Sequence, residues 1–334
     1  MKAIQITKHE HPSKLSVSEV AAPKPADGQV LVDVHAAGLN FFDILQSQGK
    51  YQNQPPMPFI LGAEFGGKIS ERSPIPKGCK YKHGDRVFGY AQGAFSEHVV
   101  SDPKSLLPIP KNVSYAQAAG IYLTFPTSYE ALVGRAKAQA GEWVLVLAGA
   151  GGVGLAACQI AKMLGCKVIA AAGSDDKRKI CVDKGGADYT IDYGKEGWQK
   201  EVMKITGGHG VDVVYDPVGM LVPSLKCVAW NSRLVVVGFA AGTIEKVPAN
   251  LVLLKQCSIV GLFWGATAIR DPPRYHEVLN LVLGHIERGE LVPYTFDKLY
   301  DGLDKVPEGL GDIENRKTWG KAIVQVVKDD KAKL

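Results

Sequence analysis

A glycine-rich segment that directly follows a run of apolar residues is the feature that most constrains the fold of this chain. Residues 143–147 read Trp-Val-Leu-Val-Leu, which is typical of a buried strand, and residues 152–164 have the pattern of a helix. Between them, residues 149–154 fit the pattern G-x-G-x-x-G. A second apolar strand at residues 167–172 completes a βαβ unit of about thirty residues. The segment therefore predicts a dinucleotide-binding loop and not merely a tight turn.

The physical roles of the loop residues follow from this prediction. In such loops one glycine makes the turn and another allows a pyrophosphate to approach the backbone, while the last lets the helix pack on the strand. The helix N-terminus adds free N–H groups and a partial positive charge for the phosphates. We therefore predict that the cofactor is bound by Gly149, Ala150, Gly151, Gly152, Val153 and Gly154.

The end of the second strand predicts which dinucleotide binds. An NAD site is expected to have an acidic residue there, hydrogen-bonded to the ribose 2′-hydroxyl, but this strand ends in alanines followed by Gly173 and Ser174. Ser174 can donate a hydrogen bond to a 2′-phosphate, and Lys177 follows one helical turn later. Asp175 and Asp176 would repel a phosphate, although acidic residues are also favoured at a helix N-terminus. On balance the pattern predicts NADPH.

The pattern of the whole chain predicts an α/β protein with two domains, since 334 residues are too many for one typical core. Residues 1–120 contain short β-like runs broken by Gly and Pro, which predicts a mainly β domain. From about residue 125 strands and helices alternate, which predicts a doubly wound parallel sheet covered on both faces. We expect further strands at residues 189–192, 211–215, 233–238, 258–262 and 321–327, and helices at 127–139, 175–184 and 275–288.

Composition excludes several classes of protein. The net charge of +5 is small and spread along the chain, so no nucleic-acid partner is expected. The six cysteines are scattered without a C-x-x-C pair, which favours a reducing compartment. No apolar run approaches a membrane span or a signal-peptide core, so no membrane association is expected and the predicted location is cytoplasmic. The C-terminal Ala332-Lys333-Leu334 is close to the peroxisomal address S-K-L, which leaves a peroxisomal location as the alternative.

Ordered motifs along the whole chain resemble one known group of enzymes. They are Gly-Leu-Asn-Phe-Phe-Asp at residues 38–43, Gly-Lys-Tyr at 49–51, Gly-Asp-Arg-Val at 84–87, the glycine loop, and the runs at 207–216, 235–239 and 320–321. With these motifs the chain resembles the zinc-independent NADPH:quinone oxidoreductase (zeta-crystallin-like) branch of the medium-chain dehydrogenase/reductase superfamily. The resemblance implies a GroES-like catalytic domain at residues 1–124, a Rossmann NADPH-binding domain at 125–264 with the cofactor between the two, and a return to the catalytic domain at 265–334. It also implies a homodimer in which late strands of the Rossmann sheet pair across a two-fold axis.

The resemblance implies roles for single residues at the adenosine end of the cofactor. Lys177 and Tyr193 match positions that contact the 2′-phosphate end, and Arg316 matches a C-terminal arginine at the same end. Tyr193 is also compatible with a place at the edge of the core, and Arg316 with a salt bridge in its loop. At the other end, Asn40 matches a residue near the nicotinamide, while Phe239 and Phe263 match residues that line it largely through their backbones.

Tyr51 is the predicted source of the proton. It follows Asn40 and Asp43 at the spacing at which the related enoyl-thioester reductases of the superfamily place their catalytic tyrosine after a similar Asn-x-x-Asp. The alternatives for Tyr51 are an aromatic wall that stacks on a ring substrate and a residue that simply flanks the Pro55-Pro56 loop. Asn40 and Asp43 are polar residues in an apolar stretch, which favours a catalytic role for both, although Asp43 could simply anchor its loop.

The residues expected of a zinc site are missing. Zinc alcohol dehydrogenases of the superfamily carry Gly-His-Glu where this chain has Gly62-Ala63-Glu64, and no cysteine lies near Asp43. Zinc needs about three nitrogen or sulfur ligands at a catalytic site and four at a structural one, but only Cys79 lies in the region of the structural four-cysteine lobe. We therefore predict no metal and expect Glu64 to hold its surroundings by hydrogen bonds.

Without a metal the chain cannot easily polarise an alcohol for oxidation. Quinones and α,β-unsaturated carbonyls are more suitable partners, because hydride addition to them gives a delocalised oxyanion that needs only a dry pocket, a donor and a proton. We therefore predict an NADPH-dependent quinone or enone reductase. The alternatives are an enoyl-thioester (acyl-CoA) reductase and a non-catalytic NADPH-binding protein with a structural or RNA-binding role.

Overall fold

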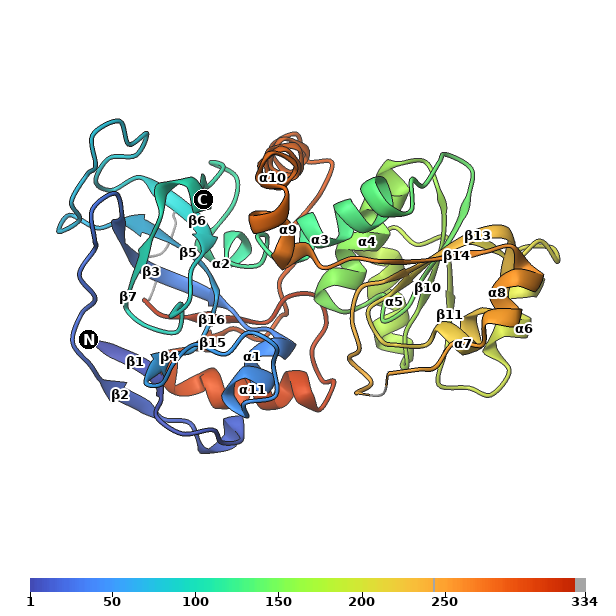
Figure 1. Ribbon diagram of the computed structural model, residues 1–334, viewed down its shortest axis with the longest axis horizontal. Helices are drawn as coiled ribbons and strands as arrows, with labels where there is room; N and C mark the ends of the chain where they lie inside the picture. The colour runs from blue at the N-terminus through green and yellow to red at the C-terminus, as the bar shows by residue number, and fades with distance from the viewer. Residues whose placement is uncertain (243, 328–334) are drawn as a thin grey trace. The chain divides into compact units, whose positions relative to one another are not determined.

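The chain forms two compact units (Figure 1). The computed structural model describes residues 1–242 and 244–327, so the C-terminal tripeptide lies outside the described residues. The first unit comprises Met1–Leu123 and the segment from Pro293 onward, and the second comprises Thr124–Val292. The sequence predicts a return to the first domain at residue 265, whereas the structure keeps residues 265–292 with the second unit. One reason is an ion pair in which Arg274 contacts Glu130 of that unit at 2.8 Å.

A six-stranded parallel sheet forms the second unit. Its strand order β11-β10-β9-β12-β13-β14 is the doubly wound order 3-2-1-4-5-6, which confirms the predicted Rossmann fold. Strand β13 begins five residues earlier than the sequence predicts. The strands are β9 (Trp143–Val146), β10 (Lys167–Ala171), β11 (Tyr189–Ile191), β12 (Val211–Asp216), β13 (Val228–Val236) and β14 (Ser258–Gly261).

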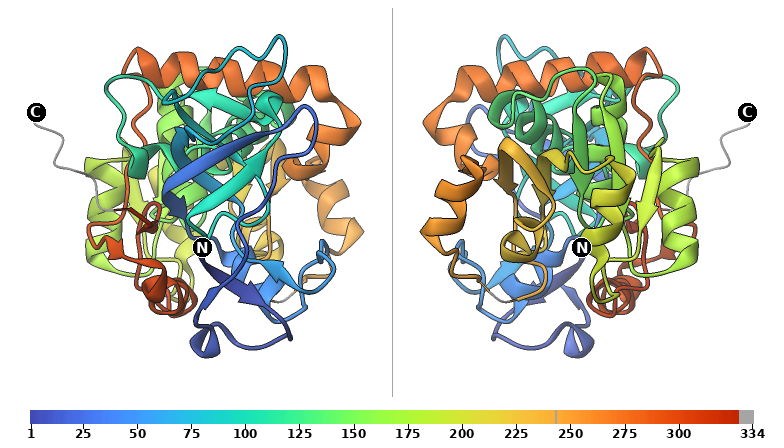
Figure 2. Two further views of the ribbon diagram at one scale, coloured as in Figure 1. Left: turned by 90° about the vertical axis from the view of Figure 1, so that its left-hand side faces the viewer. Right: turned by 90° about the vertical axis from the view of Figure 1, so that its right-hand side faces the viewer.

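Helices flank this sheet. The longest helix of the unit, α10, packs on α3 and α9 and runs along the top of the right-hand view of Figure 2. The helix predicted at residues 127–139 is instead a short α-helix followed by a π-helical segment. Helix α10 begins at two prolines, which suit the first turn because they need no N–H partner there. The elements are α3 (Thr124–Tyr129), η3 (Glu130–Arg135), α4 (Gly152–Met163), α5 (Asp175–Asp183), α6 (Trp198–Ile205), α7 (Leu221–Ser224), α8 (Ala249–Lys255), α9 (Trp264–Arg270) and α10 (Pro272–Glu287).

The first unit is mainly β, as predicted, and its strands face the viewer in the left-hand view of Figure 2. One sheet has the order β2-β1-β4; the other has the order β15-β16-β3-β5-β6-β8, with β7 also paired to β3. The strands are β1 (Lys2–Ile6), β2 (Val17–Glu19), β3 (Val30–Gly38), β4 (Phe59–Ile60), β5 (Glu64–Ile69), β6 (Arg86–Tyr90), β7 (His98–Ser101), β8 (Leu106–Pro108), β15 (Tyr300–Asp301) and β16 (Ile323–Gln325).

Short helices close the first unit, and each unit has its own buried core. Helix α11 packs Val306 and Leu310 into the same core as strands β3 and β5. A second core, in the other unit, contains Leu145, Ile169 and Val214 from neighbouring parallel strands. The helices of the first unit are η1 (Pro12–Lys14), α1 (Phe41–Ser47), η2 (Pro103–Ser105), α2 (Tyr115–Ala118), η4 (Leu303–Lys305) and α11 (Val306–Glu314). No helix among residues 1–242 and 244–327 is long and apolar enough to cross a membrane.

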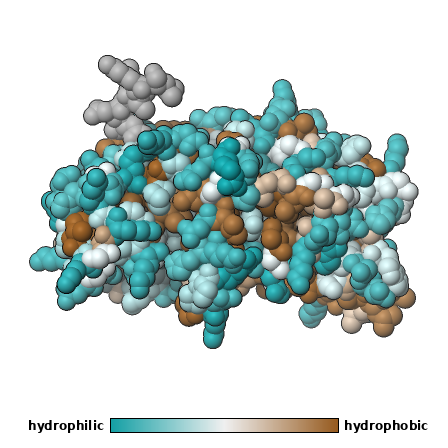
Figure 3. All heavy atoms as spheres, turned by 90° about the horizontal axis from the view of Figure 1, so that it is seen from above, coloured by the Kyte–Doolittle hydropathy of each residue, from teal (hydrophilic) through white to brown (hydrophobic). Residues whose placement is uncertain are grey.

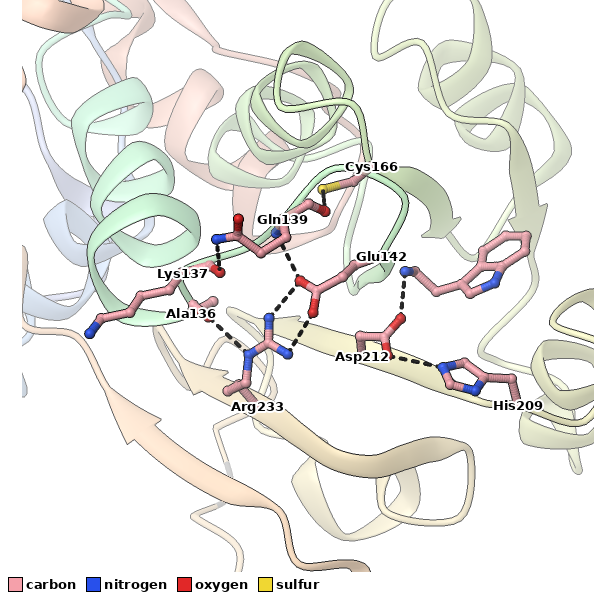
Figure 4. Close-up of polar contacts among 9 residues, drawn as sticks. Ala136, Lys137, Gln139, Glu142, Cys166, His209, Asp212 and Arg233 are labelled. Atoms are coloured by element: carbon pink, nitrogen blue, oxygen red, sulfur yellow. Dashed lines mark hydrogen bonds and ion pairs between the residues drawn. The ribbon is translucent and has the colours of Figure 1, made fainter.

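Polar side chains tie together the amino ends of three parallel strands (Figure 4). Arg233 of β13 donates to both carboxylate oxygens of Glu142, at 2.9 and 2.6 Å, and to the carbonyl of Ala136. Asp212 of β12 accepts from the backbone N–H of Trp143 at 2.8 Å and pairs with His209 at 3.0 Å. These contacts are structural. In doubly wound sheets a ligand binds at the opposite edge, outside the carboxyl ends of the strands.

Candidate functional site

The strand register of the first unit brings three distant segments together at the end of β3. Gly38, the last residue of β3, pairs with Glu64 of β5 on one side and with Ile323 of β16 on the other. Asn40 follows Gly38 by two residues, and Lys321 precedes Ile323 by two. The side chains of Asn40, Glu64 and Lys321 therefore meet although they lie far apart along the chain.

These three residues form a buried network, here called the Lys321–Glu64–Asn40 triad. The Lys321 ammonium contacts Glu64 Oε1 and donates to Asn40 Oδ1 at 2.6 Å. Asn40 Nδ2 in turn donates to Glu64 Oε1 at 3.0 Å, and the backbone N–H of Leu123 donates to the other Glu64 oxygen at 3.2 Å. Glu64 is fully buried and Lys321 is 5% exposed. A buried ion pair persists only when further hydrogen bonds satisfy its partners, as they do here.

Two glycines make room for the triad. A Cβ on Gly38 would lie 2.8 Å from both Glu64 Oε1 and Lys321 Cε, and 2.4 Å from the carbonyl oxygen of Ala119. A Cβ on Gly120 would lie 2.8 Å from Lys321 Cγ. Any larger residue at either position would displace the ion pair. This steric limit explains why the first residue of the 38–43 motif is a glycine.

Asp43 is a buried carboxyl group with one satisfied oxygen. It lies in the first turn of α1, and its Oδ2 accepts the backbone N–H of Asn40 at 2.8 Å. Its Oδ1 is buried and has no hydrogen-bond partner among the described residues. Burial raises the pKa of Asp43 to about 8; the charge of Glu64 adds to this effect, while the Asn40 N–H and the Lys321 ammonium oppose it. Asp43 is therefore a carboxyl group that holds a proton near neutral pH.

Tyr51 lies beyond the end of α1 and is half-buried. Its ring stacks on that of Phe42, with the ring centroids 5.3 Å apart. Burial raises the pKa of the Tyr51 hydroxyl, and the nearby Asp43 carboxylate raises it further. The structure thus brings together two groups that hold a proton at neutral pH, Tyr51 and Asp43, next to the fixed carboxamide of Asn40.

Lys321 is the member of this site that the sequence did not identify. It belongs to the Gly320-Lys321 motif, and the residues that follow it, at 322–324, form an apolar run. A lysine at the start of a buried strand needs a counter-charge, and this requirement indicates from the sequence that Lys321 has a buried acidic partner. No local pattern identifies the partner, because Asn40 is 281 positions away.

The glycine loop of the second unit joins β9 to α4. A Cβ on Gly154 would lie 2.1 Å from the carbonyl oxygen of Ala148, and one on Gly149 would lie 2.9 Å from Ala170 Cβ. These two glycines therefore allow close packing of the helix and strand, as predicted for Gly154. The turn itself differs from the prediction, because the left-handed residue is Ala148, with φ of 49°, and not a glycine.

The N-terminus of α4 is held in place by hydrogen bonds to buried residues, and it fits a phosphate group. Gly151 caps the helix, so the N–H groups of the first turn have no partner within it. The carbonyl of Val153 accepts from Ser128 Oγ at 2.8 Å, and Ser128 pairs with the fully buried Tyr215 hydroxyl at 2.9 Å. Ala150 and Gly152 are the residues directly before and after the cap Gly151. A helix N-terminus held in this way at the carboxyl ends of parallel strands fits the pyrophosphate of a dinucleotide.

The residues predicted for the adenosine end lie in both units. Ser174 is the N-cap of α5 and accepts the backbone N–H of Lys177 at 3.3 Å, which leaves its own O–H to donate. No atom lies within 4 Å of a Cβ built on Gly173. Tyr193 follows β11 and packs partly against the core. Arg316 follows α11 in the first unit with φ of 55°, so its proximity to the other three stays a prediction.

Two aromatic residues predicted for the nicotinamide side follow late strands of the sheet. Phe239, which comes after β13, is 41% exposed, and Phe263, which comes after β14, is 67% exposed. Both positions suit a ligand at the carboxyl edge of the sheet. Trp264 is different, since it is buried and stacks on Tyr275 with ring centroids 4.8 Å apart, so it packs α9 against α10.

The donor groups of the site do not fit a zinc ion. Within the described parts of the chain, no group of three or more His, Cys, Asp or Glu side chains is placed to hold a metal. The position at which zinc relatives carry a ligand is the buried Ala63. Glu64 is already engaged by an ammonium, a carboxamide and a backbone N–H.

Comparison with known proteins identifies relatives of both units. Residues 26–111 match the family model described as an alcohol dehydrogenase GroES-like domain, and residues 152–284 match the model described as a zinc-binding dehydrogenase. A quinone oxidoreductase-like protein 2 homolog of Nematostella vectensis is 40% identical over 89% of this chain and 81% of its own length. Human quinone oxidoreductase is 30% identical over 93% of this chain and 95% of its own length.

Solved structures agree with these matches. The quinone oxidoreductase of Escherichia coli, solved in complex with NADPH, superposes with a TM-score of 0.87 at 30% identity and covers 97% of this chain and all of its own. A probable oxidoreductase from Mycobacterium abscessus superposes with a TM-score of 0.88 at 33% identity, over 97% of this chain and 98% of its own.

Removal of the Lys321 ammonium tests the energetics of the triad. In Lys321→Met the Glu64 carboxylate stays buried without its counter-charge, so we expect the free energy of unfolding to fall by about 3 kcal/mol or more. In the double variant Glu64→Gln/Lys321→Met no charge is left unpaired, and much of this stability should return. Urea unfolding of both variants measures the difference. If the single and double variants lose the same free energy of unfolding, the Glu64 charge is not paired with Lys321 in the folded protein.

The raised pKa of Asp43 predicts a pH dependence of stability. Between about pH 4 and about pH 8 the folded chain keeps a proton on Asp43 that the unfolded chain releases. The contribution of Asp43 to the free energy of unfolding therefore falls as pH rises through that window. Asp43→Asn cannot titrate, although its side-chain oxygen can still accept from the Asn40 N–H. From pH 5 to pH 8 the variant should therefore lose less stability than the wild type, as measured by urea midpoints. Parallel profiles for the two proteins would show that Asp43 has an ordinary pKa.

Proposed function

Because the chain belongs to the medium-chain dehydrogenase/reductase superfamily, among the quinone oxidoreductase-like proteins, we propose that it is a metal-free, NADPH-dependent reductase of quinones or activated α,β-unsaturated carbonyls. The observation that carries the proposal is the Lys321–Glu64–Asn40 triad. In it an ammonium and a carboxamide engage Glu64, the residue that follows the position at which zinc dehydrogenases of the superfamily carry a ligand. Such a site cannot supply a Lewis acid, which favours acceptors that are already electrophilic.

The cofactor proposal combines the relatives with the geometry of the second unit. The Escherichia coli relative was solved with NADPH, and the glycine loop of this chain has the close-packed form that fits a pyrophosphate. The loop from Gly149 to Gly154 would hold the diphosphate, while Ser174, Lys177, Tyr193 and Arg316 would bind the adenosine 2′-phosphate. NADPH, when bound, supplies the hydride.

The residues of the first unit would supply the proton and the hydrogen bonds to the acceptor. Hydride addition leaves negative charge on the acceptor oxygen, and the Tyr51 hydroxyl would donate its proton to that oxygen. Stacking on Phe42 holds the Tyr51 ring in place, and the triad prevents the Asn40 carboxamide from rotating. Asp43, protonated near neutral pH, adds no negative charge that would oppose the developing oxyanion.

Two alternatives differ in substrate or in activity. An enoyl-thioester reductase would use the same proton donor on an acyl-CoA, and a non-catalytic protein would bind NADPH without turnover. For the location we propose the cytoplasm, with the peroxisome as the alternative. All six cysteines, each of them in the described part of the chain, are free thiols, which fits a reducing compartment.

We also propose a homodimer formed through the β14 edge of the parallel sheet. Strand β14 is the last in the sheet order and its residues are incompletely buried. Next to it, α8 has no buried residue, and its Leu253 and Leu254 are 75% and 64% exposed. Figure 3 shows hydrophobic patches on the surface, one of them at the right-hand end of the view. An open strand edge beside exposed leucines favours pairing with a second copy of the same edge.

The reductase proposal is tested by initial rates of NADPH oxidation in the presence of EDTA. The acceptors are an aromatic ortho-quinone, a small α,β-unsaturated ketone and an enoyl-CoA. We expect turnover with the quinone or the ketone, because neither needs a metal to accept hydride. A rate confined to enoyl-CoA would favour the thioester alternative, and measurable NADPH binding without any turnover would favour the non-catalytic one.

Tyr51→Phe tests the identity of the proton donor. We expect kcat to fall by about 100-fold, the size typical of a lost general acid, while the Kd for NADPH stays unchanged because the ring and its stacking remain. Tyr189→Phe, which removes a hydroxyl from an exposed tyrosine of β11, is the matched control and should leave both values unchanged. Full turnover by Tyr51→Phe would leave Tyr51 as a wall of the pocket.

Leu253→Glu/Leu254→Glu tests the dimer. Light scattering after size exclusion should give twice the mass of one chain for the wild type and the mass of one chain for the variant, because four buried carboxylates would repel across the interface. Val182→Glu, on the exposed face of α5, is the control and should stay dimeric. A monomeric wild type, or a variant that stays dimeric, would contradict the proposed interface.

A further inference from the structure

We propose that Arg178 determines the preference for NADPH over NADH by neutralising Asp175 and Asp192, the two carboxylates that flank the predicted 2′-phosphate residues. The inference rests on the proposed NADPH site and adds a specificity-determining residue to it. It also answers a conflict in the sequence, where acidic residues follow Ser174 directly although a phosphate is expected to bind there.

One guanidinium joins three segments at the adenosine end. Arg178 is the fourth residue of α5, and its Nη2 contacts Asp175 Oδ1 in the first turn of the same helix. Its Nη1 donates to the carbonyl of Ala172, just after β10, at 3.1 Å and lies 3.5 Å from Asp192 Oδ2, just after β11. The Arg178 side chain is 16% exposed, so it is held among these groups and does not extend into solvent.

The same three segments carry the residues predicted to bind the 2′-phosphate. Ser174 lies between Ala172 and Asp175, and Tyr193 directly follows Asp192. The second oxygen of Asp192 accepts the backbone N–H of Gly194 at 3.0 Å, which closes the turn around Tyr193. Arg178 therefore holds the ends of the two strands together and contacts the two carboxylates that adjoin Ser174 and Tyr193 in the sequence.

Charge is the property that links Arg178 to specificity. A phosphate monoester carries nearly two negative charges at neutral pH, whereas the 2′-hydroxyl of NADH carries none. Asp175, Asp176 and Asp192 would repel that phosphate, while Lys177 would attract it. By pairing with two of the three carboxylates, Arg178 shifts this balance toward attraction, and its removal therefore affects NADPH far more than NADH.

The test compares the dissociation constants of NADPH and NADH, measured by fluorescence titration of the whole protein at low and at physiological salt. For Arg178→Gln we expect the Kd for NADPH to rise about tenfold at low salt, the Kd for NADH to change less than twofold, and the difference to shrink as salt screens the carboxylates. Lys179→Gln removes one positive charge from the next position of α5 and is the matched control. It should leave the ratio of the two constants within about twofold of that of the wild type.

Two further variants separate charge from folding. Arg178→Gln/Asp175→Asn should recover most of the affinity for NADPH, and Asp175→Asn alone, a change at an exposed position, should bind NADPH several-fold more tightly without a change for NADH. Equal weakening of both nucleotides in Arg178→Gln, or unchanged NADPH binding in both Arg178→Gln and Asp175→Asn, would overturn the role of Arg178. A wild type that binds neither nucleotide would overturn the proposed function itself, and turnover is not needed for either conclusion.

Discussion

The buried contact between Lys321 and Glu64 is the interaction on which the candidate site depends. Both charges are out of water, so their desolvation is offset only by the contacts that they make with each other, with Asn40 and with the Leu123 N–H. Those contacts require β16 to return from the C-terminal part of the chain to the edge of β3, and they require Gly38 and Gly120 to leave space. The last part of the chain is thus needed to build a site whose other members lie within its first 65 residues.

The triad also sets the chemical character of the first unit. An ammonium contacts the Glu64 carboxylate, and hydrogen bonds to both of these groups orient the Asn40 carboxamide. Burial next to this network keeps the Asp43 carboxyl group and the Tyr51 hydroxyl protonated near neutral pH. In the proposal, the second unit contributes the N-terminus of α4 for the diphosphate, and Ser174, Lys177 and Tyr193 for the 2′-phosphate. The proposal thus assigns proton donation to the first unit and most of the cofactor binding to the second, with Asn40 and Arg316 as cofactor-binding residues of the first.

The sequence predicts the parts of this molecule that depend on local periodicity and turn chemistry. The βαβ unit around the glycine loop was predicted within one residue at each boundary, because buried strands and an amphipathic helix have distinct patterns. The left-handed turn at Ala148 was missed because an alanine in that conformation has no local signature. The π-helical segment after Tyr129 and the docking of α10 on the second unit depend on packing between distant residues, which no short pattern encodes.

The candidate site likewise combines residues that a short motif predicts with residues that only the fold brings together. Asn40, Asp43 and Tyr51 lie within twelve residues of one another, and a motif was sufficient to predict them together. For Glu64 the sequence predicts only a structural role through hydrogen bonds, and Lys321 becomes a candidate only because the sheet register places it beside Asn40. Arg178 lies within the predicted segment, but its partner Asp192 comes from the next strand, so its role appears only in three dimensions.

The claim that a buried ion pair occupies the place of a metal is tested most directly by adding zinc. The EDTA-treated protein, freed of chelator, is titrated with Zn²⁺ by calorimetry, while quinone-dependent oxidation of NADPH is followed in parallel samples. The account predicts no binding of one zinc ion per chain and no increase in rate at any zinc concentration. Binding of one zinc per chain together with a rise in rate would show that the enzyme uses a metal, and would contradict the account.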